Sequence, residues 1–162
     1  MKYIKMVIRF FFTNLAMIRL ASYKTRPRVN YYSRFTKRTH LGKNCHFNGM
    51  KVLGKGKVYI GDNFHSGSEC QIITDTHNFL GTALPYDSTF IVKDVVIGDN
   101  VWIGQRVIIL GGVTIGDGAI IQAGSVVVKS IESLGIAGGH PATVFKYRDS
   151  VHYKSLLLTK DK

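Results

Sequence analysis

A period of six residues runs through the stretch from Ile91 to Ile131. Every sixth residue is aliphatic, and this set comprises Ile91, Ile97, Ile103, Ile109, Ile115, Ile121 and Val127. The fourth residue after each is small or branched, and this set comprises Val95, Val101, Val107, Val113, Ala119, Ser125 and Ile131. Such a period fits neither an amphipathic helix nor a long alternating strand. It predicts an all-β solenoid in which short strands turn corners and stack coil upon coil.

The coil repeat follows if three hexads close one triangular turn. Residues 18 apart would then stack, with Ile97 under Ile115, Ile103 under Ile121 and Ile109 under Val127. The recurring aliphatic side chain would fill the interior, and each burial contributes about 1.5–3 kcal/mol. Glycines follow the aliphatic residue in several repeats, namely Gly98, Gly104 and Gly116. We expect them at corners, because glycine adopts positive φ at little cost.

The charge distribution is lopsided. The chain has 162 residues, enough for one domain, with 22 basic and 10 acidic side chains and a net charge of +12. Residues 1–61 contain no Asp or Glu. This basic half favours an anionic partner, such as phospholipid or an acidic glycan. Nucleic acid is disfavoured, because no nucleic-acid-binding motif accompanies the charge.

The two cysteines, Cys45 and Cys70, each follow a predicted inward position, Leu41 or Ser66, by four residues. They are therefore expected to be small buried side chains. The hexad count places them on different faces of the prism, so a disulfide is not expected. A reducing, cytoplasmic environment fits this pattern.

Residues 1–22 predict an amphipathic helix with a broad apolar face. Its narrow polar stripe comprises Lys2, Lys5, Arg9 and Thr13. Charges interrupt the apolar run before the ~18 residues that a membrane span needs, and no signal-peptide cleavage site follows. Two interpretations remain open and are compatible: a cap on the open first coil, or peripheral contact with an anionic membrane.

The rest of the chain divides around the repeats. Residues 23–40 are basic and aromatic, and are interpreted as a connecting arm or a glycan-facing surface. Residues 41–133 are expected to form the coils, and residues 134–162 a C-terminal tail. The first coils have the inward positions Leu41, Phe47, Leu53, Ile60, Ser66 and Ile72, with a one-residue slip after Leu53. The hexads stop at about 75–90, which predicts a protruding functional loop.

Three segments carry a resemblance to a known family: IGDNVWIG, GGVTIGDGAIIQAGSVVVKSI and AGGHPATVFKYR. Together they resemble the left-handed β-helix acyltransferases, the hexapeptide-repeat family that includes galactoside and maltose O-acetyltransferases. The resemblance covers about residues 41–148. It implies a left-handed parallel β-helix, a homotrimer, acetyl-coenzyme A as co-substrate and a site formed between subunits. We expect a cytoplasmic protein, with the inner face of the membrane as the alternative location.

The resemblance implies that His77 is the catalytic general base, since it lies 16 residues after Gly61 of the IGDN motif. An imidazole titrates near neutral pH, and a positioned base contributes typically about 10²–10⁴ in rate. Asp75 and Glu69 are candidates for orienting its ring. His46 and His65 lie within predicted strands and are interpreted as structural.

A metal site is not expected. The γ-class carbonic anhydrases share this coil and bind zinc through three histidines, two of them five residues apart. Here the position five residues after His77 is Thr82, so the ligand set is incomplete.

The acyl-donor site is also implied by the resemblance. Trp102 matches a tryptophan lining the donor channel, and the backbone amide near Gly104 and Gln105 matches an oxyanion donor. Ala123 and Gly124 match positions whose backbone meets the pantetheine arm. Lys129 and Lys146 match basic residues near the nucleotide end, with ordinary surface solvation as the alternative. The family's other arginine falls at Thr143, a departure for which Arg148 is the candidate replacement.

The acceptor is the least constrained part of the prediction. Asn48 lies within one residue of an acceptor-binding asparagine of the galactoside enzymes, and the loop residues Asn78, Tyr86 and Asp87 are further candidates. We expect an O-acetyltransferase that modifies a sugar hydroxyl of a bacterial surface polysaccharide or its precursor. The alternatives are an N-acetyltransferase for an amino-sugar nucleotide and a non-catalytic hexapeptide scaffold.

Overall fold

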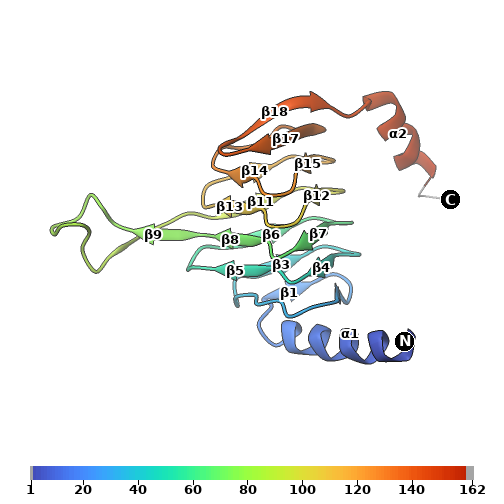
Figure 1. Ribbon diagram of the computed structural model, residues 1–162, viewed down its shortest axis with the longest axis horizontal. Coiled ribbons are helices and arrows are strands. Elements are labelled where there is room, and N and C mark those ends of the chain that lie inside the picture. The colour runs from blue at the N-terminus through green and yellow to red at the C-terminus, as the bar shows by residue number, and fades with distance from the viewer. Residues whose placement is uncertain (1, 160–162) are drawn as a thin grey trace.

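The computed structural model describes residues 2–159, which form a stack of short parallel strands. Helix α1 lies across one end of the stack, helix α2 lies beside the other end, and a long hairpin projects sideways (Figure 1). The expected parallel β-helix with an N-terminal helix and a protruding loop is confirmed.

Three sheets form the faces of the solenoid. The helices are α1 (Lys2–Met17) and α2 (Ser150–Thr159). The first face contains β1 (Ser22–Tyr23), β3 (Thr39–Leu41), β6 (Val58–Ile60), β11 (Val95–Ile97) and β14 (Thr114–Ile115). The second face contains β2 (Arg28–Val29), β4 (His46–Asn48), β7 (His65–Ser68), β12 (Trp102–Ile103), β15 (Ile120–Ile121), β17 (Gly135–Gly139) and β18 (Ala142–Tyr147). The third face contains β5 (Lys51–Leu53), β8 (Gln71–Ile73), β13 (Ile108–Leu110) and β16 (Val126–Val127).

The coil repeat has the expected register. Ile97 pairs with Ile115, Ile103 with Ile121 and Ile109 with Val127. Both inward sets from residue 95 to residue 131 are buried, so they form the continuous core of the prism. Ile91 was predicted wrongly to belong to them.

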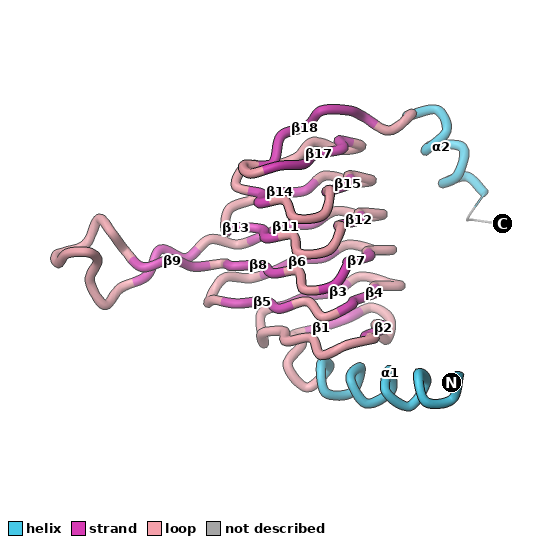
Figure 2. Tube along the Cα trace, viewed as in Figure 1, coloured by secondary structure: helices cyan, strands magenta, loops and turns pink. Residues whose placement is uncertain are grey.

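Ile91 lies on β10 (Phe90–Val92), which pairs antiparallel with β9 (Asp75–His77) in the projecting hairpin. Its side chain is only half-buried. Ile91 lies six residues before Ile97, so it fits the six-residue period although β10 lies outside the prism. For this reason the period wrongly predicted an inward position for Ile91. Figure 2 shows the hairpin leaving the stack between β8 and β11.

The N-terminal segment differs from the prediction. The helix ends at Met17, and Ser22–Tyr23 pair with β3 instead of continuing it. Residues 23–40 are not a connecting arm, because β1 and β2 pair in parallel with β3 and β4 and complete a first coil. Buried Val29 and Phe35 continue the hexad count back from Leu41, a signal present in the sequence.

The slip in the early coils falls earlier than expected. Val52 is fully buried and pairs with Ile72, whereas Leu53 is half-buried. The pairing of β4 with β7 shifts register between His46 and Asn48. This irregularity moves the inward position from Leu53 to Val52.

The corner glycines serve a different purpose from the one predicted. Positive φ occurs two residues later, as at Asn100 (57°) and Gly118 (69°), rather than at Gly98 or Gly116. Glycine is required at the predicted positions because neighbouring coils approach closely there. A Cβ on Gly104, for example, would lie 2.5 Å from the backbone nitrogen of Ala123.

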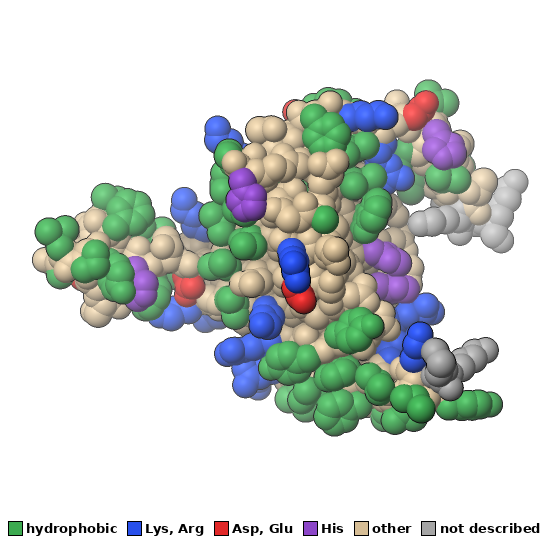
Figure 3. Space-filling model, viewed as in Figure 1, with side chains coloured by type: hydrophobic (Ala, Val, Ile, Leu, Met, Phe, Trp, Pro, Cys, Tyr) green, Lys and Arg blue, Asp and Glu red, His purple; other side chains and the backbone are tan. Residues whose placement is uncertain are grey.

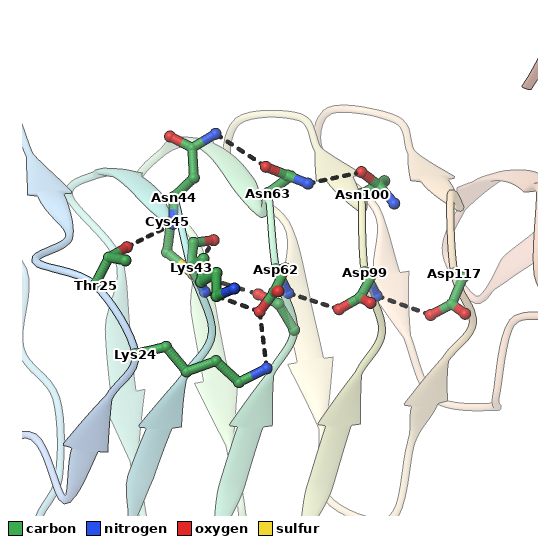
Figure 4. A network of polar contacts seen from close by, with 11 residues as sticks. Lys24, Thr25, Lys43, Asn44, Cys45, Asp62, Asn63, Asp99, Asn100 and Asp117 are labelled. Atoms are coloured by element: carbon green, nitrogen blue, oxygen red, sulfur yellow. Dashed lines mark hydrogen bonds and ion pairs between the residues drawn. The ribbon is translucent and has the colours of Figure 1, made fainter. Parts of the chain in front are cut away.

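Two polar ladders tie successive coils together at one corner (Figure 4). The Asp62 carboxylate accepts the Lys43 N–H at 2.9 Å, Asp99 accepts the Asp62 N–H at 2.6 Å and Asp117 accepts the Asp99 N–H at 2.8 Å. Beside them, amide side chains bond in series from Asn44 to Asn63 to Asn100. The second ladder ends just before β12 and so fixes the start of the strand that carries Trp102.

Both cysteines are buried free thiols, as expected. Cys45 lies before β4 and Cys70 before β8, so they lie at the starts of different faces. Within residues 2–159, no helix is long and apolar enough to cross a membrane.

Candidate functional site

The projecting hairpin is organised by two of the predicted acceptor residues. The Asn78 side chain donates to Thr89 Oγ1 at 3.0 Å and accepts the Leu80 N–H at 3.0 Å. The Asp87 carboxylate accepts the N–H groups of Thr89 and Thr82 at 2.9 and 3.1 Å. Hydrogen bonds from Thr89 and Thr82 lower the pKa of Asp87. Both side chains therefore shape the loop.

His77 ends β9 and is solvent-exposed. Its ring stacks on Tyr86, with centroids 3.8 Å apart, and contacts Phe90 with centroids 4.7 Å apart. Neither carboxylate proposed to orient it does so within this chain. Asp75 accepts the Lys55 N–H at 3.1 Å, and Glu69 pairs with Arg106 at 2.7 Å.

Trp102 points outward from β12 on the second face, with 56% of its surface exposed. Its strand neighbours in register are His65 on β7 and Ile120 on β15. Below Trp102, the rings of His46 and His65 stack with centroids 4.2 Å apart. Partial burial, and then the adjacent His65, lower the pKa of His46. His46 is half-buried and His65 is exposed, and both lie on the outer surface of the second face. The sequence analysis interpreted both histidines as structural.

Helix α2 borders the same face. The Asn100 side chain donates to the Tyr153 hydroxyl at 3.0 Å, and the Arg148 guanidinium lies 4.9 Å from the Tyr153 ring centre. A cavity of about 500 Å³ lies between helix and sheet, with Trp102 and His65 in its wall. Arg148 also donates to the Gly118 carbonyl at 3.1 Å, so this candidate phosphate ligand already has partners. Sequence reasoning missed Tyr153, whose role depends on a contact 53 residues away.

The predicted donor residues meet at one corner of two successive coils. The Gln105 carbonyl accepts the Gly124 N–H at 2.8 Å, and its side-chain oxygen accepts the Ser68 hydroxyl at 3.2 Å. Across residues 2–159 the Gln105 backbone N–H has no hydrogen-bond acceptor. Gly124 has a φ of 73°, and a Cβ there would meet no atom within 4 Å. The corner thus has an unpaired N–H donor at Gln105, close to Gly67 of the preceding coil, and open space at Gly124 of the following coil. A backbone N–H donor is what an oxyanion site requires.

The remaining predicted residues are two lysines and Asn48. Lys129 follows β16 and Lys146 lies on β18, and both are exposed. The Asn48 side chain donates to the Ser66 carbonyl at 2.6 Å and accepts from Asn30 at 2.8 Å. It borders a cavity of about 930 Å³ between the second and third faces. Tyr31, Tyr32, Lys51, Glu69 and Arg106 also line that cavity.

The hairpin and the tryptophan face different directions within one chain. In Figure 1, β9 projects to one side of the stack, and β12 lies toward the other. His77 and Trp102 are therefore not brought together by a single protomer. Within residues 2–159, no group of three or more His, Cys, Asp or Glu side chains is placed to hold a metal ion.

Short parallel strands in a six-residue period, with an outward tryptophan and a histidine-bearing hairpin, define a hexapeptide-repeat β-helix protein. Residues 94–129 match the family model described as bacterial transferase hexapeptide (six repeats). The chain belongs to the hexapeptide-repeat family.

Its relatives include named sugar acetyltransferases. The chain is 32% identical to galactoside O-acetyltransferase of Escherichia coli, in an alignment that covers 75% of this chain and 62% of the Escherichia coli protein. A maltose O-acetyltransferase structure from Clostridium difficile shares 36% identity over 80% of this chain and 66% of that one, with a TM-score of 0.65. A Vibrio cholerae hexapeptide-repeat acetyltransferase, solved with acetyl-coenzyme A, shares 27% identity over 84% and 76% of the two chains, with a TM-score of 0.69.

The chain spans between 31% and 62% of the lengths of the first curated relatives that it matches.

Proposed function

We propose that this protein is an acetyl-coenzyme A-dependent O-acetyltransferase that modifies a sugar hydroxyl. The observation that carries the proposal is the corner at Gln105, whose backbone N–H has no acceptor among residues 2–159 and whose carbonyl accepts the N–H of Gly124 on the next coil. The outward Trp102 on the adjoining strand supplies an apolar wall for the acyl donor. Relatives named as galactoside and maltose O-acetyltransferases support the sugar acceptor.

The proposed reaction is a direct transfer in a ternary complex. His77 accepts the proton of the acceptor hydroxyl, and the oxygen attacks the thioester carbonyl. The Gln105 N–H stabilises the oxyanion of the tetrahedral intermediate. Collapse of that intermediate breaks the carbon–sulfur bond, and the thiolate of coenzyme A takes the proton. The products are an acetyl ester and free coenzyme A.

The site requires more than one protomer. His77 is carried away from the Trp102 face by its hairpin, so we propose that a neighbouring subunit supplies the histidine within a homotrimer. An active, stable monomer, measured by light scattering during gel filtration, would contradict this arrangement.

The acceptor is proposed to be a bacterial surface polysaccharide or its precursor, modified in the cytoplasm or at the inner face of the membrane. The cavity beside Asn48 supports a sugar ligand, because Tyr31 and Tyr32 offer aromatic surface and Lys51, Glu69 and Arg106 offer polar groups. Ring faces cover the apolar faces of sugars, and charged groups bond their hydroxyls.

The test measures release of the coenzyme A thiol with a panel of mono- and oligosaccharide acceptors. His77→Ala should lower turnover by about 10²–10⁴-fold, while calorimetry shows nearly unchanged acetyl-coenzyme A binding. His152→Ala, on exposed α2, is the matched control. Undiminished turnover of His77→Ala would refute the mechanism.

The product distinguishes the alternatives. Mild base hydrolyses an ester and leaves an amide, so a base-stable acetyl group would identify the N-acetyltransferase alternative on an amino-sugar nucleotide. If acetyl-coenzyme A did not bind, the non-catalytic scaffold would be favoured.

A further inference from the structure

Helix α1 packs on the solenoid through the C-terminal part of one side. Its buried positions are Thr13 and Ala16, with Phe12 partly buried beside them. The Thr13 hydroxyl accepts the Val29 N–H of β2 at 3.2 Å. Arg9 lies on the same side, one helical turn before Thr13. The helix therefore covers the first coil, as a cap would, through Phe12, Thr13 and Ala16, while Arg9 stays exposed.

The broad apolar face of α1 consequently points away from the protein. The exposed apolar residues of α1 are Tyr3, Ile4, Met6, Val7, Ile8, Phe10, Phe11 and Leu15, and exposed Ile18 follows the helix. Ile4, Val7 and Phe11 follow the spacing of one helical face, and each is more than 60% exposed. Figure 3 shows hydrophobic side chains gathered along this end of the molecule. An apolar surface of this extent in one place marks an interaction site.

Basic side chains flank this apolar face without acidic neighbours from the same segment. Arg26 lies 5.3 Å from the Phe10 ring centre and donates to the Asn14 side chain at 2.9 Å. Lys5 and Arg19 are exposed. No Asp or Glu occurs in residues 1–61. The end of the molecule thus combines an apolar face with a positive rim, which is the arrangement of helices that lie in an anionic membrane surface.

We propose that α1 lies in the headgroup region of an anionic lipid bilayer, with its apolar face toward the acyl chains. Because the helix runs across the end of the stack (Figure 1), the coils would stand upright on the membrane. A second copy of the chain fits this face less well, since end-to-end pairing would bring two basic rims together. The inference does not depend on the proposed acetyl transfer, because the outward face of α1 includes neither the hairpin nor the corner at Gln105, and Phe12, which borders the cavity beside Asn48, lies on the opposite side of the helix.

The test is co-sedimentation of the full chain with vesicles of phosphatidylcholine alone or mixed with phosphatidylglycerol. The protein should sediment with the anionic vesicles, remain largely soluble with the neutral ones, and be partly released by salt. The double variant Val7→Glu/Phe11→Glu should partition at least about tenfold more weakly, because two side chains lose their transfer from water. Leu80→Glu/Leu84→Glu is the matched control, with two exposed leucines of the hairpin changed in the same way.

Circular dichroism would verify that both double variants are folded, which is expected because all four positions are exposed. Wild-type protein that stays in solution with both kinds of vesicle would overturn the proposal, as would unchanged binding by Val7→Glu/Phe11→Glu. Light scattering without lipid tests the second-copy alternative. A smaller assembled mass for Val7→Glu/Phe11→Glu than for wild type and control would make this face a subunit contact and also overturn the proposal.

Discussion

The imidazole of His77 and the phenol ring of Tyr86 are stacked, with centroids 3.8 Å apart and planes 15° from parallel. Both residues belong to the hairpin that leaves the solenoid after β8, His77 at its root and Tyr86 across the loop. The loop therefore holds the imidazole by ring stacking, while its shape is set by the hydrogen bonds of Asn78 and Asp87. A contact internal to one loop thus takes the place of the carboxylate that the sequence led us to expect.

Removal of this stacking should impair catalysis more than acyl-donor binding. Tyr86→Ala is expected to lower kcat/KM for the acceptor by about 10²-fold, because a base displaced by about 1 Å loses its alignment. Tyr86→Phe keeps the ring and should retain activity within about threefold if stacking, rather than the hydroxyl, positions His77. Steady-state kinetics with the acceptor varied would measure both. Equal losses in the two variants would instead make the hydroxyl an acceptor ligand.

Gly124 offers a test of the donor corner. Gly124→Ala should cost about 1–2 kcal/mol of stability, because a residue with a Cβ is strained at positive φ, although no atom lies within 4 Å of that Cβ. The KM for acetyl-coenzyme A should rise at least about tenfold, since the methyl group would occupy the space proposed for the pantetheine arm. Gly112→Ala is the control, because Gly112 also has positive φ, at 91°, and borders the flexible side chain of Lys93. A KM that is unchanged in both variants would remove Gly124 from the donor site.

The hexad core predicts a strong contrast between inward and outward positions. Ile103→Ala should destabilise the protein by about 2–5 kcal/mol, because it opens a cavity in a fully packed prism. Val96 lies on β11 with 41% of its surface exposed, and Val96→Ala should stay within about 1 kcal/mol. Urea denaturation at one fixed protein concentration would measure both, because subunit association also contributes to stability. Similar losses at the two positions would contradict the proposed core.

Burial of Cys45 raises the pKa of its thiol from the ordinary 9.0 to about 11, and burial also raises the pKa of Cys70. Near about pH 8 roughly one Cys45 thiol in a thousand is ionised, so both cysteines should resist alkylation until the protein unfolds. The folded state holds the Cys45 proton more tightly than the unfolded state does. Its stabilising contribution is therefore complete below pH 9.0 and is lost as the pH rises toward about 11. Rapid alkylation of native protein, followed by mass spectrometry, would refute the buried placement.

The six-residue period is enough to predict the solenoid and most of its core. The residue that points into the prism must be aliphatic at every sixth position. Ile97, Ile103 and Ile109 therefore predict the three faces of one coil without any information about the coils next to it. The same six-residue spacing, extended from Leu41 back to Phe35 and Val29, also predicts the first coil. The excursion was predictable because the hexads stop there. These features are local periods, and a local period can be read directly from a sequence.

Tertiary structure alone decided which groups face each other. The hydrogen bond from the Gly124 N–H to the Gln105 carbonyl, and the Asn100–Tyr153 contact that holds α2, join residues 19 and 53 positions apart. The orientation of α1 likewise depends on the hydrogen bond that the Val29 N–H of β2 donates to the Thr13 hydroxyl. Such contacts form only when the coils close and stack, because stacking brings together residues that are far apart in the sequence. No pattern of neighbouring residues specifies them.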